Sequence, residues 1–330
     1  MIVYSRNRRL RTSESLRQLV QQTVLGVNDL VLPMFVMEGK DKIEPIDSMP
    51  GVFRRSLDLT VKECKEIYSM GIKGINLYMK VSEDLKDNTG KESWNDNGLM
   101  QTAIKAIKDA VPGLVIMPDV ALDPYSIYGH DGIVNNGKID NDATNDALVK
   151  MSLSLAKAGA DILAPSDMMD ARVAMIRGAL EENSFSDVGI LSYAAKYASA
   201  FYGPFRSALD SAPKESELVP KDKKTYQMDF ANSREALDEV LKDVDEGADI
   251  IMIKPGMPYL DIVSEVRNMI DLPIAVYHVS GEYAMLKAAA QQGWIDNDKA
   301  LLESLTCIKR AGADMIFTYA AKEVATLLQA

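Results

Sequence analysis

The chain contains 330 residues, of which 47% are hydrophobic and 26% charged, and this ordinary composition excludes a disordered or fibrous protein. Its formal net charge of −11 argues against a general nucleic-acid binder, which would carry a basic face. Its two cysteines, Cys64 and Cys307, form neither a disulfide framework nor a Cys-x-x-Cys metal pair, which favours a reducing, cytoplasmic setting.

The first 29 residues are basic and then amphipathic, and they precede the first predicted strand. We expect residues 1–29 to form an arm that packs on a neighbouring subunit. A transit peptide, and with it an organellar stroma, is the minor alternative, because this start lacks acidic residues. No apolar run approaches the roughly 20 residues that cross a bilayer, so we expect no membrane partner.

Short β-rich runs and amphipathic helical stretches then alternate along the chain. The predicted strands are 30–36, 73–78, 114–118, 161–165, 188–193, 249–254, 273–278 and 314–319. The predicted helices are 61–70, 100–110, 144–158, 168–182, 233–246, 260–270, 282–292 and 298–311. Three similar joints, KAGADILAPS, EGADIIMIKPG and RAGADMIFTYA, each end a helix at Gly just before a buried strand.

Eight strands that alternate with helices predict a (β/α)₈ TIM barrel over residues 30–330, as a single catalytic domain. An open doubly wound sheet is the alternative, but no Gly-x-Gly-x-x-Gly follows the first strand. Two polar segments, 80–99 and 207–228, follow the second and fifth strands. In a barrel these loops lie on the catalytic face, and we expect 207–228 to form an active-site lid.

Two lysines mark the predicted barrel mouth. Lys254 closes the strand DIIMIK, and Lys196 follows the strand VGILSY by a few residues. For one such lysine, a side chain that reaches solvent is the simpler interpretation. Two lysines on adjacent strands would lower each other's pKa and leave a neutral amine that attacks a carbonyl group. The pair therefore predicts Schiff base chemistry.

Polar residues follow the other strands. The third strand is followed by Asp119, Asp123 and Asp131, and the fourth by Ser166, Asp167 and Asp170. These side chains could bind a hard cation or activate water, or they could serve only in turns and helix caps. Ser280 and Tyr319 follow the last two strands as hydroxyl donors for a carboxylate or carbonyl oxygen. Arg206, after the fifth strand, suits a substrate carboxylate.

Long strings of this sequence resemble the 5-aminolevulinic acid dehydratase, or porphobilinogen synthase, family. They include APSDMMDARV, KYASAFYGPFR, GADIIMIKPGMPYLDI and AVYHVSGEYAML, and the resemblance covers nearly the whole chain. The family implies a (β/α)₈ barrel with an N-terminal arm, assembled as a homo-octamer. It also implies a reaction in tetrapyrrole biosynthesis that joins two 5-aminolevulinate molecules per active site to porphobilinogen, with loss of two waters.

The resemblance also implies roles for individual residues. Lys254 would form a Schiff base with one substrate, and Lys196 would form or assist the second. Ser280 and Tyr319 match the carboxylate binders of the Lys254 side. The remaining implied site residues bind the other carboxylate or line the pocket: Arg206, Lys223, Gln227, Phe201, Tyr202, Asp119, Ser166 and Asp167.

The sequence departs from zinc-using members in residues 119–132. Their three cysteines are replaced by Ala121, Asp123 and Asp131, and carboxylates favour magnesium or monovalent cations over zinc. We therefore expect no zinc. Glu239 matches the carboxylate of an activating, allosteric Mg²⁺, while Asp123 and Asp131 are candidates for a second cation, a point that the sequence leaves open.

Two other functions are alternatives, a class I aldolase and a regulatory barrel without activity. A class I aldolase acting on a sugar phosphate would need a phosphate site after the last two strands, where VSGEYAM offers no basic residue before Lys287. A regulatory barrel without activity would not need Lys196, Lys254 and Arg206 together. The sequence therefore favours a magnesium-type porphobilinogen synthase.

Overall fold

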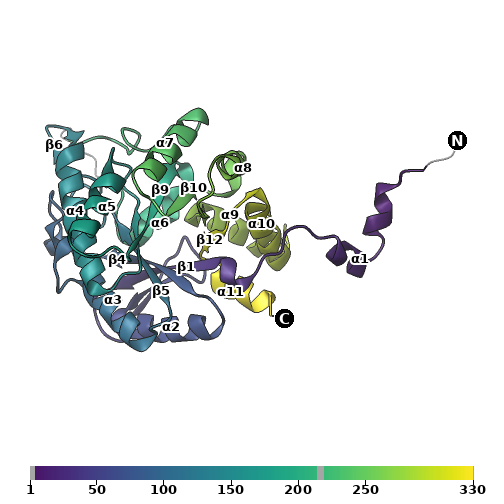
Figure 1. The fold of residues 1–330 in the computed structure, drawn as a ribbon. Helices are drawn as coiled ribbons and strands as arrows, with labels where there is room; N and C mark the ends of the chain where they lie inside the picture. The colour runs from purple at the N-terminus through teal and green to yellow at the C-terminus, as the bar shows by residue number, and fades with distance from the viewer. Residues whose placement is uncertain (1–3, 214–218, 330) are drawn as a thin grey trace.

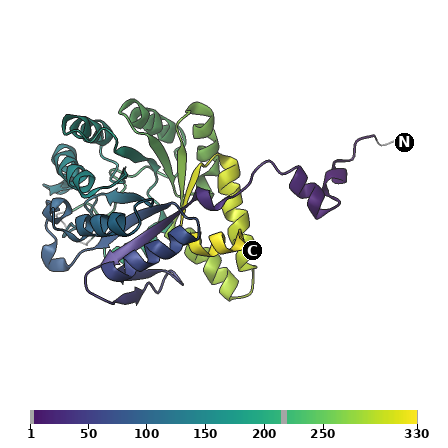
Figure 2. The ribbon, with the colours of Figure 1, turned by 60° about the horizontal axis from the view of Figure 1, so that its bottom comes forward.

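The computed structural model describes residues 4–213 and 219–329, which form a closed barrel of parallel strands surrounded by helices (Figures 1 and 2). The barrel strands are β1 (Leu30–Met37), β4 (Gly74–Lys80), β5 (Val115–Val120), β8 (Ile162–Pro165), β9 (Gly189–Lys196), β10 (Ile250–Lys254), β11 (Ile274–His278) and β12 (Met315–Thr318). β12 pairs with β1 through Leu30–Ile316 and Val31–Phe317, which closes the barrel. The predicted TIM barrel is confirmed.

Barrel strands are apolar because they are buried on both faces. All eight residues of β1 are buried, between side chains of the barrel interior and the outer helices. The outer helices are α2 (Leu57–Ser69), α3 (Leu99–Ala110), α4 (Asn141–Ala158), α5 (Arg172–Glu182), α7 (Arg234–Asp245), α8 (Leu260–Met269), α9 (Ser280–Gln291), α10 (Asn297–Ala311) and α11 (Ala321–Leu327). Gly159 ends α4 at a φ of 104°, as the repeated joint predicts.

Several short elements lie in the loops on the catalytic face. Two hairpins form from β2 (Ile43–Pro45) with β3 (Phe53–Ser56) and from β6 (Val134–Asn135) with β7 (Lys138–Ile139), and β3 also extends β1 in parallel. α6 (Gly203–Leu209) follows β9. The 3₁₀ turns in these loops are η3 (Glu83–Leu85), η4 (Lys91–Trp94), η5 (Ala200–Tyr202) and η6 (Met257–Tyr259). None of these elements was predicted from the sequence.

Two sequence predictions need correction. The helix predicted from residue 168 begins at Arg172, because Met168 and Ala171 adopt positive φ angles of 70° and 63° in a turn. The strand predicted to end at Tyr193 runs on to Lys196, so this lysine ends the strand instead of following it.

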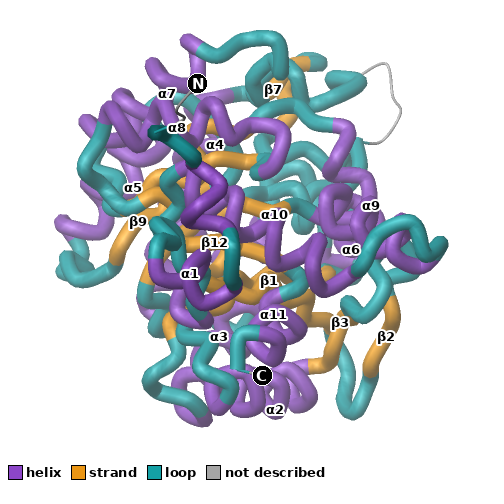
Figure 3. Tube along the Cα trace, turned by 90° about the vertical axis from the view of Figure 1, so that its right-hand side faces the viewer, coloured by secondary structure: helices purple, strands orange, loops and turns teal. Residues whose placement is uncertain are grey.

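The N-terminal segment extends away from the barrel (Figures 1 and 2), and Figure 3 looks toward it from its own side. It contains η1 (Asn7–Arg11), α1 (Glu14–Leu19) and η2 (Val27–Asp29). Leu19 is 83% exposed and Val24 is 70% exposed, whereas Leu25 is buried against the barrel. No helix of the described ranges is both long and apolar enough to cross a membrane.

Candidate active site

The two lysines lie side by side at the carboxyl ends of neighbouring strands. Lys196 ends β9, Lys254 ends β10, and the two residues are partners in the parallel register. Their exposed fractions are only 5% and 6%. Because the carboxyl ends of the strands form the catalytic face of a TIM barrel, this pair marks the candidate active site.

Aromatic rings surround the Lys254 ammonium. Its Nζ lies 4.5 Å from the ring centre of Tyr277, 5.1 Å from those of Tyr193 and Phe205, and 5.2 Å from that of Tyr202. Burial, reinforced by the charge of Lys196, lowers the pKa of Lys254 to about 7. A substantial fraction of this amine is therefore neutral at physiological pH, as nucleophilic attack on a carbonyl group requires.

Lys196 is held by oxygen atoms instead. Its Nζ donates a hydrogen bond to the backbone carbonyl of Ser166 and lies 3.4 Å from Asp131 Oδ2. The two neighbouring lysines thus have opposite surroundings, polar for Lys196 and aromatic for Lys254. The two amines therefore have different electrostatic environments.

Asp131 connects Lys196 to the segment predicted as a lid. Lys223 Nζ lies 2.7 Å from Asp131 Oδ1 and 3.4 Å from Asp123 Oδ2, and Gln227 Nε2 lies 3.4 Å from Asp131 Oδ2. Burial would raise the pKa of Asp131, but the charges of Lys196 and Lys223 outweigh it and hold that pKa well below its usual range. Residues 219–228 therefore close the site through buried ion pairs; residues 214–218 of the predicted lid lie outside the described residues.

Asp119 differs from the other carboxylates in the site. Burial first, and the charge of Asp123 second, raise its pKa to about 7. Its Oδ1 is buried and has no hydrogen-bond partner among the described residues. A carboxyl group that titrates near neutral pH suits proton transfer to or from a bound substrate.

These residues enclose a cavity of about 20 Å³, which is the space of about one water molecule. Its lining comprises Tyr78, Asp119, Asp123, Asp131, Ser166, Lys196, Tyr202, Phe205, Arg206, Lys223, Gln227 and Lys254. The described residues therefore leave little free space at this site, and we expect the covering segment 219–228 to move when a substrate enters.

Four residues predicted for this site lie outside the lining of the cavity, namely Phe201, Ser280, Tyr319 and Asp167. The Ser280 hydroxyl accepts from the Phe205 N–H at 3.1 Å and donates to the Phe201 carbonyl at 3.3 Å. The Tyr319 hydroxyl lies 3.1 Å from that of Tyr277, and Asp167 Oδ1 accepts from the Met169 N–H at 2.7 Å. In the described structure the Ser280 and Tyr319 hydroxyls therefore contact neighbouring protein groups and do not line the lysine cavity.

Of the aromatic residues around Lys254 and its cavity, Tyr202 was predicted from the sequence, whereas Tyr78, Tyr193, Tyr277 and Phe205 were not. Tyr78, Tyr193 and Tyr277 each lie in a barrel strand, and Phe205 lies in α6. The signal was present, because these tyrosines interrupt otherwise apolar strands close to their carboxyl ends. A buried hydroxyl at that position needs a hydrogen-bond partner. The Tyr78 and Tyr193 hydroxyls are partners of each other, at 3.0 Å.

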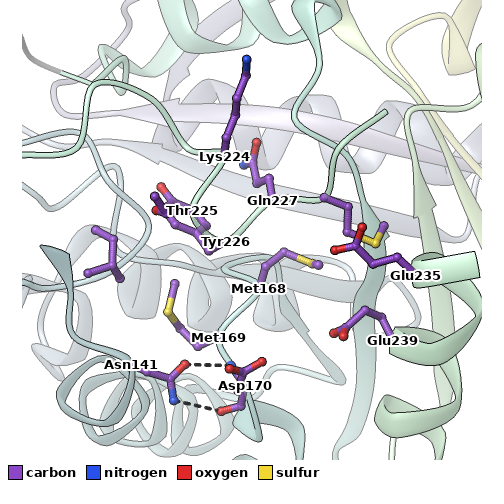
Figure 4. Close-up of a pocket in the computed structure, with 12 residues that line it drawn as sticks. Asn141, Met168, Met169, Asp170, Lys224, Thr225, Tyr226, Gln227, Glu235 and Glu239 are labelled. Atoms are coloured by element: carbon purple, nitrogen blue, oxygen red, sulfur yellow. Dashed lines mark hydrogen bonds between the residues drawn. The ribbon is translucent and has the colours of Figure 1, made fainter. Parts of the chain in front are cut away.

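Glu239 lies in a second cavity of about 310 Å³ (Figure 4). Asp170, Glu235 and Glu239 line this cavity with Lys224, and Glu239 Oε1 accepts from Lys242 at 2.8 Å. In the described ranges, no three acidic, His or Cys residues converge to hold a metal ion directly. An ion in this cavity would have room to keep bound water molecules beside Glu239.

Comparisons with known proteins identify the family of this chain. The family model for delta-aminolevulinic acid dehydratase matches residues 4–327. The delta-aminolevulinic acid dehydratase of Synechococcus elongatus is 49% identical over 327 residues, covering 98% of both chains. The chloroplastic enzyme of Chlamydomonas reinhardtii is 51% identical over 320 residues, covering 96% of this chain and 82% of its own.

A solved structure extends the likeness to the fold. The delta-aminolevulinic acid dehydratase (porphobilinogen synthase) of Toxoplasma gondii, in complex with the reaction product porphobilinogen, is 49% identical with a TM-score of 0.95. The match covers 98% of this chain and 92% of that one. On the family match, the identities and the shared fold, this chain belongs to the delta-aminolevulinic acid dehydratase family.

Proposed function

We propose that the chain condenses two molecules of 5-aminolevulinate to porphobilinogen, with loss of two waters, and that it does so as a zinc-independent, magnesium-stimulated enzyme. The observation that carries the chemistry is the pair of buried lysines at partnered strand ends, one of them with a pKa of about 7. Two amines in one closed site match a reaction that uses two keto substrates.

Lys254 begins the reaction in this proposal. Its neutral Nζ attacks the ketone carbon of one substrate, and the carbinolamine loses water to leave a carbon–nitrogen double bond to the enzyme. The departing oxygen needs a proton, and Asp119 is suited to supply it because its pKa of about 7 lets it carry one at neutral pH. The aromatic rings around Nζ exclude water and favour the cationic Schiff base.

Lys196 serves the second substrate in the same way or assists its addition. Arg206, Lys223 and Gln227 are proposed to bind the carboxylate of that substrate, and all three line the cavity. Ser280 and Tyr319 are proposed for the carboxylate of the substrate on Lys254. The walls of the pocket are proposed to include Phe201 and Tyr202. Ser166 and Asp167 are proposed to line the site.

The metal proposal rests on the types of side chain present. Ala121, Asp123 and Asp131 offer no thiolate for zinc, and the Lys223 ammonium already lies against both aspartates. A cation bound there would have to displace that ammonium. Magnesium instead fits the cavity of Glu239, where it would neutralise carboxylate charge beside residues 224–228. Gln227 lines both cavities, which supports an allosteric effect on the lid.

The assembly is proposed to be a homo-octamer in which the N-terminal arm covers a neighbouring subunit. Leu10, Leu19 and Val24 are exposed in the single chain, and burial against a neighbour removes this apolar surface from water. The proposed location is the cytoplasm, with an organellar stroma as the alternative.

An assay for porphobilinogen with and without magnesium tests the activity. We expect product from 5-aminolevulinate, loss of activity on mild chelation, and recovery with magnesium but not zinc. Borohydride added with 5-aminolevulinate should label Lys254 covalently. Absence of label on both Lys254 and Lys196 would refute the mechanism, and recovery with zinc alone would refute the metal assignment.

The Glu239→Gln variant separates the two cavities. We expect it to lose stimulation by magnesium while Lys254 remains open to borohydride labelling, because Glu239 is not part of the lysine cavity. Stimulation that persists in this variant would place the activating ion elsewhere.

A further inference from the structure

Glu282 is a fully buried carboxylate that the proposed chemistry does not use. It is the third residue of α9, and its exposed fraction is 0%. Among the described residues no lysine or arginine is paired with it, and burial raises its pKa to about 7. A buried carboxylate without a cationic partner is costly, so its retention calls for a physical reason.

The partners of Glu282 come from two different loops of the active site. Its Oε2 accepts from the Val279 N–H at 2.7 Å and from the Gly256 N–H at 3.2 Å, while Oε1 accepts from the Met257 N–H at 2.5 Å. The bond from Val279 is an ordinary capping contact within one helix start. The bonds from Gly256 and Met257 are not, because those residues begin the loop that follows Lys254.

Both loops carry proposed substrate contacts. Gly256 lies two residues after Lys254, and Val279 lies immediately before Ser280. The Lys254 carbonyl accepts from the Tyr197 N–H at 3.0 Å and from the Tyr202 hydroxyl at 3.2 Å, so the strand end is fixed from the other side. Glu282 thus spans the gap between the amine and the hydroxyl that serve one substrate.

Close packing around α9 leaves its first turn little freedom. A Cβ on Gly281 would lie 2.5 Å from the Phe201 carbonyl oxygen, and a Cβ on Gly256 would lie 3.1 Å from the Tyr277 carbonyl oxygen. The backbones of these segments therefore touch directly. The Glu282 carboxylate accepts from both loops and bridges them where the packing is this close.

We propose that Glu282 is a positioning residue that fixes the Lys254 loop and the Ser280 turn as one rigid unit. It touches neither substrate, and it sets the separation between the attacking amine and the group that binds the same substrate's carboxylate. The proposal rests on the proposed function, because it assigns Glu282 to the Lys254 side of that reaction.

The Glu282→Gln variant tests this role with little change in volume. Its amide group must point an NH₂ at one or more backbone N–H donors, so at least one of the three bonds is lost. We expect the rate of borohydride trapping at Lys254 to fall about ten- to hundredfold, together with a raised KM for 5-aminolevulinate, because small displacements of reacting groups slow reactions by such factors.

Asp296→Ala provides a matched control, because Asp296 caps the neighbouring helix α10 through the Lys299 N–H at 3.0 Å. Both substitutions remove a helix-start contact and should lower the unfolding temperature, but only Glu282→Gln should change trapping and KM. Wild-type trapping kinetics and KM in folded Glu282→Gln would overturn the positioning role. Failure of the wild type to be trapped would instead refute the proposed function.

The native protein offers a measurement that needs no variant. If Glu282 joins the two loops, the amides of Gly256, Met257 and Val279 should gain protection from hydrogen exchange together when substrate is trapped on Lys254. Protection that changes in one loop without the other would overturn the proposal. If Glu282→Gln does not fold, Glu282→Asp replaces it; the shorter carboxylate should give the same changes in trapping and KM, and unchanged values would again overturn the role.

Discussion

The Lys254 amine is close to half-neutral at physiological pH, since burial and the nearby Lys196 charge lower its pKa to about 7. Only the neutral amine attacks a carbonyl group, so we expect the rate of Schiff base formation to rise with a midpoint near pH 7. It should fall again at higher pH, because Asp119, whose pKa is also about 7, then loses the proton that the departing oxygen needs. Single-turnover trapping with cyanoborohydride across the neutral range measures this profile.

Lys196→Met provides the internal comparison for that profile. The substitution removes a positive charge that disfavours protonation of Lys254, so the midpoint should move to higher pH. A midpoint that stays in place would show that burial alone sets the reactivity of Lys254.

Asp131 is the second residue whose charge state governs the site. Asp131→Asn leaves the buried Lys196 and Lys223 without their shared counter-charge, which should cost about 3–5 kcal/mol of the free energy of unfolding at neutral pH. Denaturant unfolding of both proteins measures this difference. The longer Asp123 contact, 3.4 Å, makes Asp123→Asn a milder control.

The pH dependence of that stabilisation has a definite sign. The pKa of Asp131 is lowered in the folded protein, so its contribution is complete above its ordinary value of 3.8 and is lost as the pH falls toward the folded-state value. The difference between wild type and Asp131→Asn should therefore shrink in acid. A difference that is constant with pH would contradict the ion-pair explanation.

At the scale of elements, the covering segment 219–228 is held by a small number of contacts. The Tyr226 hydroxyl lies 3.0 Å from His130 Nδ1 and accepts from the Asp131 N–H at 3.3 Å, while His130 Nε2 donates to the Pro220 carbonyl at 2.8 Å. Burial lowers the pKa of His130, which keeps its ring neutral and suited to this pattern.

Tyr226→Phe removes both contacts of the hydroxyl and should shift the segment toward open positions. We expect the KM for 5-aminolevulinate to rise several-fold, while the free energy of unfolding falls by only about 1 kcal/mol. Steady-state kinetics and thermal unfolding separate the two effects. An unchanged KM with reduced stability would mean that the hydroxyl supports the fold and not closure.

The barrel could be predicted from the sequence because each strand is a short apolar run that is recognisable from local sequence alone. Each predicted strand overlaps an observed one, and the Lys196–Lys254 pairing follows from adjacent strand ends. The contacts of the covering segment could not be predicted in this way. Lys223 meets Asp131 across 92 positions of sequence, and only the packed loops bring the two together. The partners of Ser280 and Tyr319 are hidden for the same reason.

For the whole molecule, the proposed role of the N-terminal arm in assembly can be tested by truncation. A variant that starts at Leu25 removes the exposed Leu10, Leu19 and Val24 but keeps the first residue buried on the barrel. We expect the barrel to fold and the particle to become smaller, because those apolar contacts to a neighbour are lost. Sedimentation velocity measures the particle, and an assembly of unchanged size would show that the barrels associate without the arm.

The cavity of about 20 Å³ has room for about one water molecule, so opening of the site must change the amount of water that it holds. Sites for small molecules occupy about 300 Å³ or more, so every opening must draw in bulk water, and every closure must return it. We therefore expect turnover to depend on water activity. Large osmolytes that cannot enter the barrel mouth should favour the closed form, slow both substrate entry and product release, and leave the chemistry at the lysines untouched.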